Sequence, residues 1–333
     1  MLMRNLLKLT CISLALCGEL AMAQTNIRVA STARPGSILM NYVDEMVSKV
    51  NMNSNGAVKA ERLFIQSEQE MTSQLVRGRI EMANVSYTGI SALVPEAALL
   101  NMPFLWKSDE ERDYVTDNHA LPILKRTFEA KGLYIVGLVE IGWADVFCKT
   151  ACLTPADVKG MKVRVAPAVT SKLFWSSVGA NGVQMPVSEL FPGLQSGLVD
   201  GGDLPFTYYV TTPAAQSAPH YVMTRHLHQA YTLVINKASW DKLSSDHQKL
   251  LLNARPDLAR TRKEIAESEK PQMAAFRAKG GFVHELSAAQ RDVWAKLVEP
   301  HQQKLVDEIG GQSGALWAAI QKGKQEFSAR GGK

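Results

Sequence analysis

One arginine has the surroundings of an anion-binding residue. Arg164 lies between Val163 and Val165, in an apolar run that predicts an inner strand. An unpaired cation is costly in such a position, so the side chain is expected to have an anionic partner. A guanidinium group presents a planar fork of N–H donors that matches the two oxygens of a carboxylate. We therefore predict that Arg164 binds a carboxylate, in preference to the alternative of a solvated surface arginine.

Three further polar residues lie at the ends of predicted strands. Thr32 follows the run at residues 26–31, and Ser86 and Tyr87 lie at the end of the run at residues 80–86. Sheets of α/β proteins commonly present ligand-binding groups at the carboxyl ends of their strands. We therefore expect Thr32, Ser86 and Tyr87 to contribute to ligand binding.

Motifs for enzymatic chemistry are absent from the sequence. It has no G-x-S-x-G turn, no phosphate-binding glycine loop and no H-E-x-x-H, which are the usual signatures of hydrolases, nucleotide-binding proteins and metalloproteases. His226 and His228 would share one face of a strand, but no third ligand accompanies them, so a structural role is predicted. We predict a protein that is not an enzyme and has no cofactor, and we leave open a cation that bridges protein and ligand.

The first 23 residues have the layout of an export signal. Arg4 and Lys8 supply positive charge, residues 9–17 are mostly apolar, and small residues precede a cleavage site near Ala23. The apolar stretch is shorter than the ~20 residues that a membrane span requires. We expect export to the periplasm and a mature chain that begins near Gln24.

Cysteine usage agrees with an exported chain. Cleavage removes Cys11 and Cys17, and the bulky Leu16 argues against lipid attachment at Cys17. Cys148 and Cys152 remain, in a compartment where disulfides persist. A local bridge between them is predicted, with two free thiols as the alternative, because spacing alone does not fix the distance between their Cα atoms. The C-x-x-x-C spacing differs from the C-x-x-C of redox enzymes.

Length and charge narrow the class of protein. About 310 residues remain after cleavage, more than one core usually spans, which favours two lobes. The formal net charge of the full chain is +5, and its Lys and Arg residues are scattered. That distribution is too diffuse for a nucleic-acid footprint, but it suits an anionic ligand.

Strand and helix patterns alternate along the mature chain, which is typical of α/β lobes. Strands are predicted at residues 26–31, 58–64, 80–86 and 161–165, and helices at residues 40–50, 68–77 and 188–197. A longer helical pattern covers residues 245–279. Pro256 and Pro271 interrupt this pattern, so kinks or breaks are expected there.

A series of ordered motifs follows Cys148 and Cys152 in the sequence. Residues 157–165 read Asp-Val-Lys-Gly-Met-Lys-Val-Arg-Val, and residues 194–201 read Leu-Gln-Ser-Gly-Leu-Val-Asp-Gly. Gly179-Ala180, Met185-Pro186, Glu189 and Pro205 accompany them, and weaker agreement covers most of the mature chain. Together the motifs resemble the solute-binding subunits of tripartite ATP-independent periplasmic (TRAP) transporters, the DctP-like family.

The resemblance implies an α/β fold of two lobes, joined by crossing strands and by a long helix that spans both, with the ligand enclosed when the lobes close. We predict that lobe I comprises residues 24–141 and 230–269, and lobe II residues 142–229 and 270–333. The resemblance implies that Arg164 pairs with the carboxylate of a small organic acid. It also implies delivery of that acid to membrane permease subunits. A monomer is expected, because the protein must diffuse between ligand and permease.

Two departures from the family pattern bear on the ligand. Many members carry a second arginine where this chain has Ala144, and many have Asp-Gly-Gln-Glu-Asn-Pro where residues 200–205 read Asp-Gly-Gly-Asp-Leu-Pro. The site therefore lacks one cation of the family pattern, and Leu204 replaces an amide. These losses disfavour a dicarboxylate or a ligand that resembles sialic acid.

A monocarboxylate with an apolar or aromatic body is predicted instead. Trp143, Leu204 and Phe206 would supply apolar contact area. Asp145 or Asp203 would receive an amine or hydroxyl, or help to hold a bridging cation. Two other functions remain open: an extracytoplasmic sensor that presents the same ligand to a receptor, and a periplasmic hydrolase or lyase that would turn it over.

Overall fold

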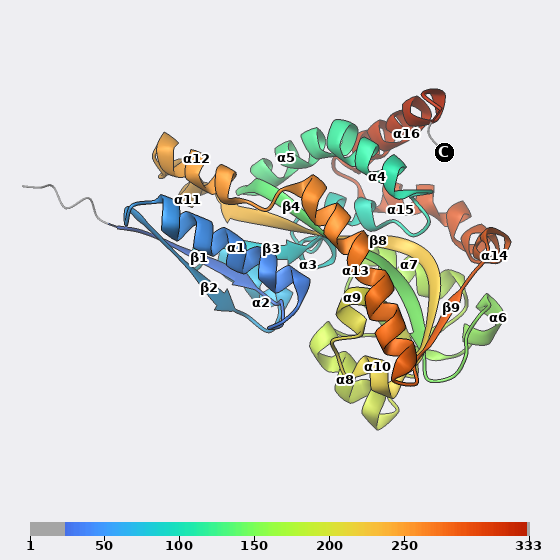
Figure 1. Cartoon of the computed structure of the whole chain (residues 1–333). Coiled ribbons are helices and arrows are strands. Elements are labelled where there is room, and N and C mark those ends of the chain that lie inside the picture. The colour runs from blue at the N-terminus through green and yellow to red at the C-terminus, as the bar shows by residue number, and fades with distance from the viewer. Residues whose placement is uncertain (1–23, 332–333) are drawn as a thin grey trace, which may run out of the picture.

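The computed structural model describes residues 24–331. The predicted export signal, with Cys11, Cys17 and the cleavage site near Ala23, lies outside the described residues. The described chain forms one nine-stranded sheet with helices packed around it (Figure 1), in the strand order β2-β1-β3-β8-β4-β7-β5-β6, with β9 beside β8. The strands are β1 Thr25–Ser31, β2 Val58–Phe64, β3 Met82–Ser86, β4 Leu133–Cys148, β5 Lys162–Val165, β6 Asn181–Gln184, β7 Gly201–Pro205, β8 His220–Asn236 and β9 Phe282–Glu285.

Two long antiparallel strands, β4 and β8, run through the middle of the sheet. They pair from Leu133 opposite Asn236 to Cys148 opposite His220, so each contributes to both halves of the molecule. β3 pairs with the C-terminal part of β8, and β7 with the C-terminal part of β4. The predicted crossing strands are confirmed. Their register shifts at three points, one of them at Gly142, whose φ of 101° is a conformation that favours glycine.

The helices follow the strands in the alternation that the sequence predicts. They are α1 Ile38–Asn53, α2 Glu68–Val76, α3 Tyr87–Ile90, α4 Asp109–Val115, α5 Leu121–Ala130, α6 Pro155–Val158, α7 Val169–Ser177, α8 Val187–Ser196, α9 Phe206–Tyr209, α10 Ala214–Ser217, α11 Lys237–Asp241, α12 Ser245–Ala254, α13 Leu258–Ala278, α14 Ala288–Val298, α15 Gln302–Ile309 and α16 Ser313–Ala329, with short turns η1 Pro95–Asn101, η2 Thr116–Ala120 and η3 Glu299–His301. No helix in residues 24–331 combines the length and apolar character that crossing a membrane would require.

Four apolar clusters on the faces of the sheet define two lobes. Lobe I has one cluster around Leu75 and Phe128 and another around Val43 and Leu251, and lobe II has one around Leu190 and Tyr209 and another around Trp175 and Trp294. Each lobe therefore buries side chains on both faces of its part of the sheet, as α/β layers do.

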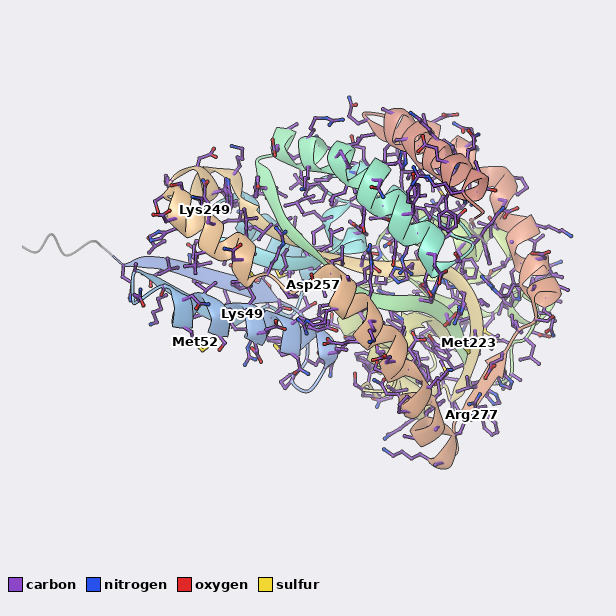
Figure 2. All side chains as sticks on the ribbon, turned by 45° about the horizontal axis from the view of Figure 1, so that its top comes forward. Lys49, Met52, Met223, Lys249, Asp257 and Arg277 are labelled. Carbon is purple, nitrogen blue, oxygen red and sulfur yellow. A yellow bond between two sulfur atoms is a disulfide. The ribbon has the colours of Figure 1, made fainter. Side chains whose placement is uncertain are left out.

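The helix α13 spans both lobes, as predicted. Figure 2 shows Asp257 at its start and Arg277 near its end. In its first half Glu264 accepts a hydrogen bond of 2.9 Å from Tyr42 of lobe I, and in its second half Phe276 packs in a lobe II cluster. The predicted interruption at Pro256 is confirmed, because α12 ends before it and α13 starts after it. At Pro271 the helix continues without a break.

The C-terminal helix differs from the predicted division of the chain. The prediction assigns residues 270–333 to lobe II, but α16 packs against α4, η2 and α5 of lobe I. Its Leu316 and Ile320 are fully buried in a lobe I cluster. The chain thus returns to lobe I after α14, and lobe I gains the helix at its C-terminal end.

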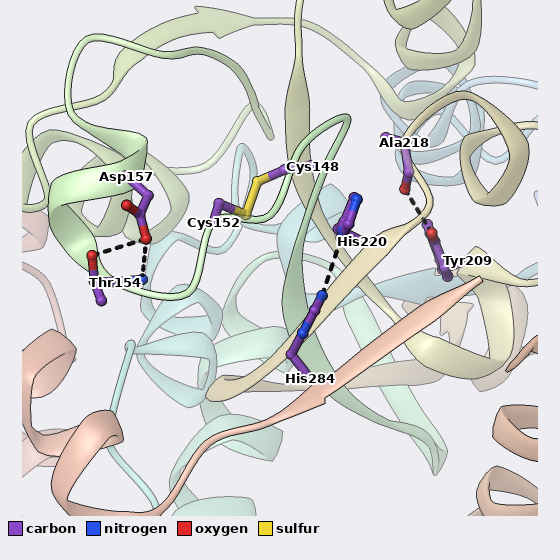
Figure 3. Close-up of a disulfide and its surroundings, with 8 residues drawn as sticks. All are labelled: Cys148, Cys152, Thr154, Asp157, Tyr209, Ala218, His220 and His284. Atoms are coloured by element: carbon purple, nitrogen blue, oxygen red, sulfur yellow. Dashed lines mark hydrogen bonds between the residues drawn. A yellow bond between two sulfur atoms is a disulfide. The ribbon is translucent and has the colours of Figure 1, made fainter. Parts of the chain in front are cut away.

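A disulfide joins Cys148, the last residue of β4, to Cys152 in the loop before α6 (Figure 3). The two Cα atoms are 6.3 Å apart, and both residues are buried with Val158 and Trp175 in a lobe II cluster. Of the two alternatives that the sequence leaves open, the structure has the bridge. The bond fixes the end of a strand that both lobes share.

Replacing both Cys148 and Cys152 by alanine is expected to lower the free energy of unfolding by about 2 kcal/mol, because the bridge closes only a short loop of the unfolded chain. Urea unfolding of the ligand-free protein measures the change. Dithiothreitol should destabilise the wild type by a similar amount and leave the double variant unchanged. Equal unfolding midpoints for the two proteins in non-reducing buffer would contradict the expectation.

Candidate functional site

A cavity of about 80 Å³ lies between the lobes, next to the crossing of β4 and β8. Polar residues outnumber apolar ones in its wall, and both lobes contribute to it. The lining residues are Thr32, Glu68, Ser86, Thr88, Ile141, Ala144, Arg164, Ala166, Thr170, Ser171, Val187, Asp203, Leu204, Pro205, Tyr208, Leu227, Gln229 and Tyr231. Five residues predicted to bind ligand therefore meet at one place: Thr32, Ser86, Arg164, Asp203 and Leu204.

Arg164 is the cation of this cavity. It lies on β5 between two buried valines, and its own side chain is only 6% exposed. Its Nε donates a hydrogen bond of 3.1 Å to the carbonyl oxygen of Met185. No carboxylate in residues 24–331 lies within ion-pair distance of its guanidinium. Burial lowers the pKa of Arg164, and the charge of Asp203 only partly offsets this effect. The guanidinium is thus held in a buried position without a paired anion.

Asp203 on β7 is tied to the protein by two neighbours. Its Oδ1 accepts a hydrogen bond of 2.9 Å from the indole N–H of Trp175, and its Oδ2 lies 3.8 Å from Nε2 of His226. Burial raises the pKa of Asp203, but His226 and Arg164 outweigh burial and bring the pKa below its ordinary value. Asp203 is therefore an ionised carboxylate at neutral pH, and one side of the cavity carries negative charge.

His226 and His228, which the sequence places two residues apart, have separate surroundings in the structure. His226 is fully buried, stacks on Phe174 at 3.9 Å between ring centroids, and lies beside Asp203. His228 packs edge-on against Trp143 and lies 3.7 Å from Glu140. Burial holds the pKa of His228 well below its ordinary value. In residues 24–331 no group of three or more His, Cys, Asp or Glu side chains is arranged to hold a metal ion.

Glu68 is a cavity residue that the sequence analysis missed. It is the first residue of α2, and its carboxylate accepts hydrogen bonds from the backbone N–H of Ser86 at 2.9 Å and from the Ser86 hydroxyl at 2.7 Å. Burial raises the pKa of Glu68, although Ser86 and Arg164 act in the opposite direction. Ser86 therefore holds Glu68 in place, and Glu68 brings a second carboxylate to the cavity wall.

The strand β8 contributes two further residues that the sequence analysis missed. Tyr231 and Gln229 line the cavity, and the side-chain oxygen of Gln229 accepts a hydrogen bond of 3.1 Å from Asn101. Burial, followed by the charge of Glu68, holds the pKa of Tyr231 well above its ordinary value. The run Tyr231-Thr232-Leu233-Val234-Ile235 was a usable signal, because its aromatic and β-branched residues are typical of a strand.

Trp143 and Asp145 lie on the other face of the sheet from the cavity. Side chains alternate along a strand, so Ala144 between them faces the cavity and its two neighbours face away. The Trp143 indole donates a hydrogen bond of 2.9 Å to Asp109 and lines a groove of about 590 Å³ beside α13. This placement does not support the predicted ligand contacts of Trp143 and Asp145.

Phe206 and Tyr87 also lie outside the cavity lining. Phe206 is 1% exposed and packs edge-on against Tyr221 and Phe276 in the core of lobe II. Tyr87 is 2% exposed and belongs to the core of lobe I. Phe206 follows the cavity residue Pro205, and Tyr87 follows the cavity residue Ser86. Each is the first residue of a short helix, where the chain turns the side chain into the core. The predicted ligand contacts of these two residues are likewise unsupported.

Asp145 is a buried acid whose protonation should affect stability. It accepts hydrogen bonds from the Tyr221 hydroxyl and from the backbone N–H of Arg225. Burial raises its pKa to about 7, while the bond from Arg225 lowers it. A raised pKa means that the folded state keeps a proton that the unfolded chain releases from about pH 4 upward. The contribution of this group to stability is therefore complete at low pH and is lost as the pH rises through about 7.

Replacing Asp145 by asparagine is expected to flatten the decline of stability between pH 5 and pH 7. One such group can contribute up to about 1.4 kcal/mol per pH unit, and an amide oxygen can still accept the bond from Arg225. Urea unfolding of both proteins across this range gives the difference. Asp246 is a matched control, because its side chain is 90% exposed. A variant with the same slope as the wild type would show that Asp145 is ionised in the folded protein.

The fold and the cavity together define a two-lobed ligand-binding protein. The chain matches the DctP family, described as bacterial extracellular solute-binding protein family 7, over residues 29–308, and it belongs to that family. It is 25% identical over 319 residues to the C4-dicarboxylate-binding periplasmic protein DctP of Rhodobacter capsulatus, which covers 90% of this chain and 95% of the relative. It is 28% identical over 255 residues to the 2,3-diketo-L-gulonate-binding periplasmic protein YiaO of Escherichia coli, covering 72% and 78%.

A solved structure has the same architecture. The TRAP periplasmic solute-binding protein of Sulfurospirillum deleyianum, with bound succinate, superimposes with a TM-score of 0.82 at 24% identity, and the match covers 91% of this chain and 99% of that one. The predicted α/β fold of two lobes is thereby confirmed. The family is periplasmic, which agrees with the predicted location, whereas the predicted cleavage site lies in the part of the chain that is not described.

Proposed function

We propose that this protein is the solute-binding subunit of a TRAP transporter, which captures a small organic acid in the interlobe cavity and delivers it to a membrane permease as a monomer. The observation that carries the proposal is Arg164, a buried guanidinium at a cavity wall without an ion-paired carboxylate. A ligand carboxylate would be this missing anion, and it would accept two charge-assisted hydrogen bonds from the guanidinium. Binding of this kind favours the conformation in which both lobes contact the ligand, which is the state that a permease could distinguish.

We further propose that the ligand is a monocarboxylate with a hydroxyl or amine group. Among the lining residues Arg164 is the sole cation, while Glu68 and Asp203 are both carboxyl groups. A second ligand carboxylate would therefore meet the like charge of Asp203, whereas a hydroxyl or amine could donate a hydrogen bond to either acid. Ile141, Leu204 and Leu227 offer apolar contact to the carbon skeleton.

The molecules bound by related solved structures support only the broader part of this proposal. They include succinate, β-D-glucuronate, galactonate and orotic acid. Each of these carries a carboxylate, which agrees with a carboxylate site at Arg164. Their bodies differ widely in size and polarity, so the choice among acids depends on the other lining residues, which include Glu68 and Tyr231 in this chain.

A thermal-shift screen with matched pairs of acids tests the proposal. 3-Hydroxybutyrate against butyrate tests the hydroxyl group, and succinamate against succinate tests the second charge. Hydroxylated monocarboxylates are expected to raise the melting temperature most, and mass spectrometry should recover them unchanged after incubation. Stabilisation by neutral sugars or by cations alone would refute the carboxylate site. A larger effect of succinate than of every monocarboxylate would refute the finer assignment alone.

A further inference from the structure

Two histidines of lobe II form a close pair away from the ligand cavity. His220 is the first residue of β8 and His284 lies on β9, and Nδ1 of His220 is 3.1 Å from Nε2 of His284 (Figure 3). The parallel pairing of these strands places His220 opposite Phe282. Because side chains alternate along a strand, Phe282 and His284 face the same side of β9. The two imidazoles therefore meet on one face of the sheet.

The rings are held in place by their neighbours. The His220 ring stacks on Phe282 at 4.5 Å between centroids, and its plane is within 10° of the His284 plane. On its other side His220 pairs with Cys148 of β4, which the disulfide to Cys152 anchors. A ligand pair that is fixed before binding loses less conformational freedom when it takes up a ligand.

The charges around the pair leave both rings available as electron-pair donors. In residues 24–331 neither ring lies within ion-pair distance of a carboxylate; the histidines that do are His119, His226 and His228. Both rings are partly exposed, so solvent reaches them. Burial lowers the pKa of both imidazoles, and His220 lowers that of His284 further. Neutral imidazole is the form that coordinates metal ions.

We propose that His220 and His284 form a two-imidazole site for a borderline divalent metal ion of the Zn²⁺, Ni²⁺ or Cu²⁺ class. Two metal–nitrogen bonds of about 2.0 to 2.1 Å, at angles between square and tetrahedral, hold their nitrogens about 3 Å apart, close to the separation seen here. The metal would replace the hydrogen bond between the rings, with the remaining proton of each ring on its other nitrogen. Water completes the coordination, because residues 24–331 offer no third protein ligand at this position.

A metal at this position would add a second link between β9 and β8, which already pair in the sheet. β9 follows α13, and β8 is one of the two crossing strands, so the ion would attach the lobe II end of the interlobe helix to the shared sheet. Two protein ligands are half of the set of a structural zinc site. We therefore expect a dissociation constant of roughly ten micromolar, far weaker than that of a permanently bound structural ion.

Titration calorimetry of the untagged mature protein with Cu²⁺, Ni²⁺ and Zn²⁺ tests the site. One ion should bind per chain, and H220Q and H284Q should each weaken binding at least tenfold. The control is H301Q, which removes an exposed histidine elsewhere. Electron paramagnetic resonance of the Cu²⁺ form should show two coordinating nitrogens. Circular dichroism and urea unfolding verify that each variant folds.

Three results would overturn the site. They are the absence of binding below about 1 mM, a Cu²⁺ spectrum with one nitrogen ligand, and binding that survives in a folded variant with both histidines replaced. None of these results depends on the organic acid, so the metal site and the transport function stand or fall separately.

Discussion

Alanine at position 164 is expected to abolish the thermal shift produced by whichever acid stabilises the wild type most. The loss in binding free energy should be on the order of 2 to 5 kcal/mol, as for the truncation of one partner in a buried, hydrogen-bonded charge pair. This corresponds to a dissociation constant raised roughly thirtyfold or more. Titration calorimetry with that acid measures the change. The expectation rests on the burial of Arg164 and on the absence of an ion-paired carboxylate beside it in the described chain.

Two further variants separate ligand binding from folding. Lysine at position 164 keeps the charge but loses the planar fork, so its affinity should fall between those of wild type and alanine. Arg62 is an exposed arginine paired with Asp44, and its replacement by alanine should leave affinity unchanged. The ligand-free Arg164→Ala protein should be at least as stable as the wild type, because a buried unpaired cation is costly. Wild-type affinity in Arg164→Ala would remove this residue from the site.

Replacing Glu140 by alanine is expected to cost about 3 to 5 kcal/mol of folding stability. Glu140 lies on β4 beside the register shift at Gly142, and it is 3% exposed. Its Oε1 accepts hydrogen bonds of 3.0 and 2.9 Å from Arg262 of α13, and its Oε2 lies 3.1 Å from Nη2 of Arg112. Removing the carboxylate leaves two poorly solvated guanidinium groups. In the described chain their remaining partners are more exposed acids: Asp109 and Asp113 for Arg112, and Asp113 and Asp117 for Arg262.

Urea unfolding of the ligand-free protein measures this loss. Glu267 is the control, because it lies on α13 with Arg262, is 66% exposed and has its paired cation, Lys263, 3.8 Å away. Its replacement by alanine should change stability by less than about 0.5 kcal/mol. If Glu140→Ala stays within 1 kcal/mol of the wild type, the ion pairs contribute no more than surface pairs do.

The sequence predicted the local structure of residues 26–86 closely. The strand at residues 58–64 has the predicted bounds, and the helices at residues 40–50 and 68–77 differ from α1 and α2 only at their ends. Local apolar periodicity determines these elements, and it can be read without knowledge of the fold. The C-terminal helix α16 was assigned to the wrong lobe because its partners, α4 and α5, lie about two hundred residues earlier in the chain.

The candidate site could be predicted only in part. Arg164 and Asp203 were found because each occupies a position in a motif. Trp143 and Asp145 were placed in the site through another segment of the family pattern, residues 142–145, but side chains alternate along β4, so Ala144 faces the cavity and these two do not. Glu68 was missed because an acid in the first turn of a helix is usually explained by the helix dipole. Its contribution to the cavity follows from the packing of α2 beside β3, which no local pattern reveals.

The sharing of β4 and β8 by both lobes has a consequence for how the molecule comes apart. A cut between the lobes would sever both strands, in addition to the helix α13, and leave four strand ends without their ladder partners, so neither half is a unit that can persist by itself. Loss of structure in one half removes pairing partners from the other. The protein should therefore melt in a single cooperative step, with probes in either half reporting the same transition.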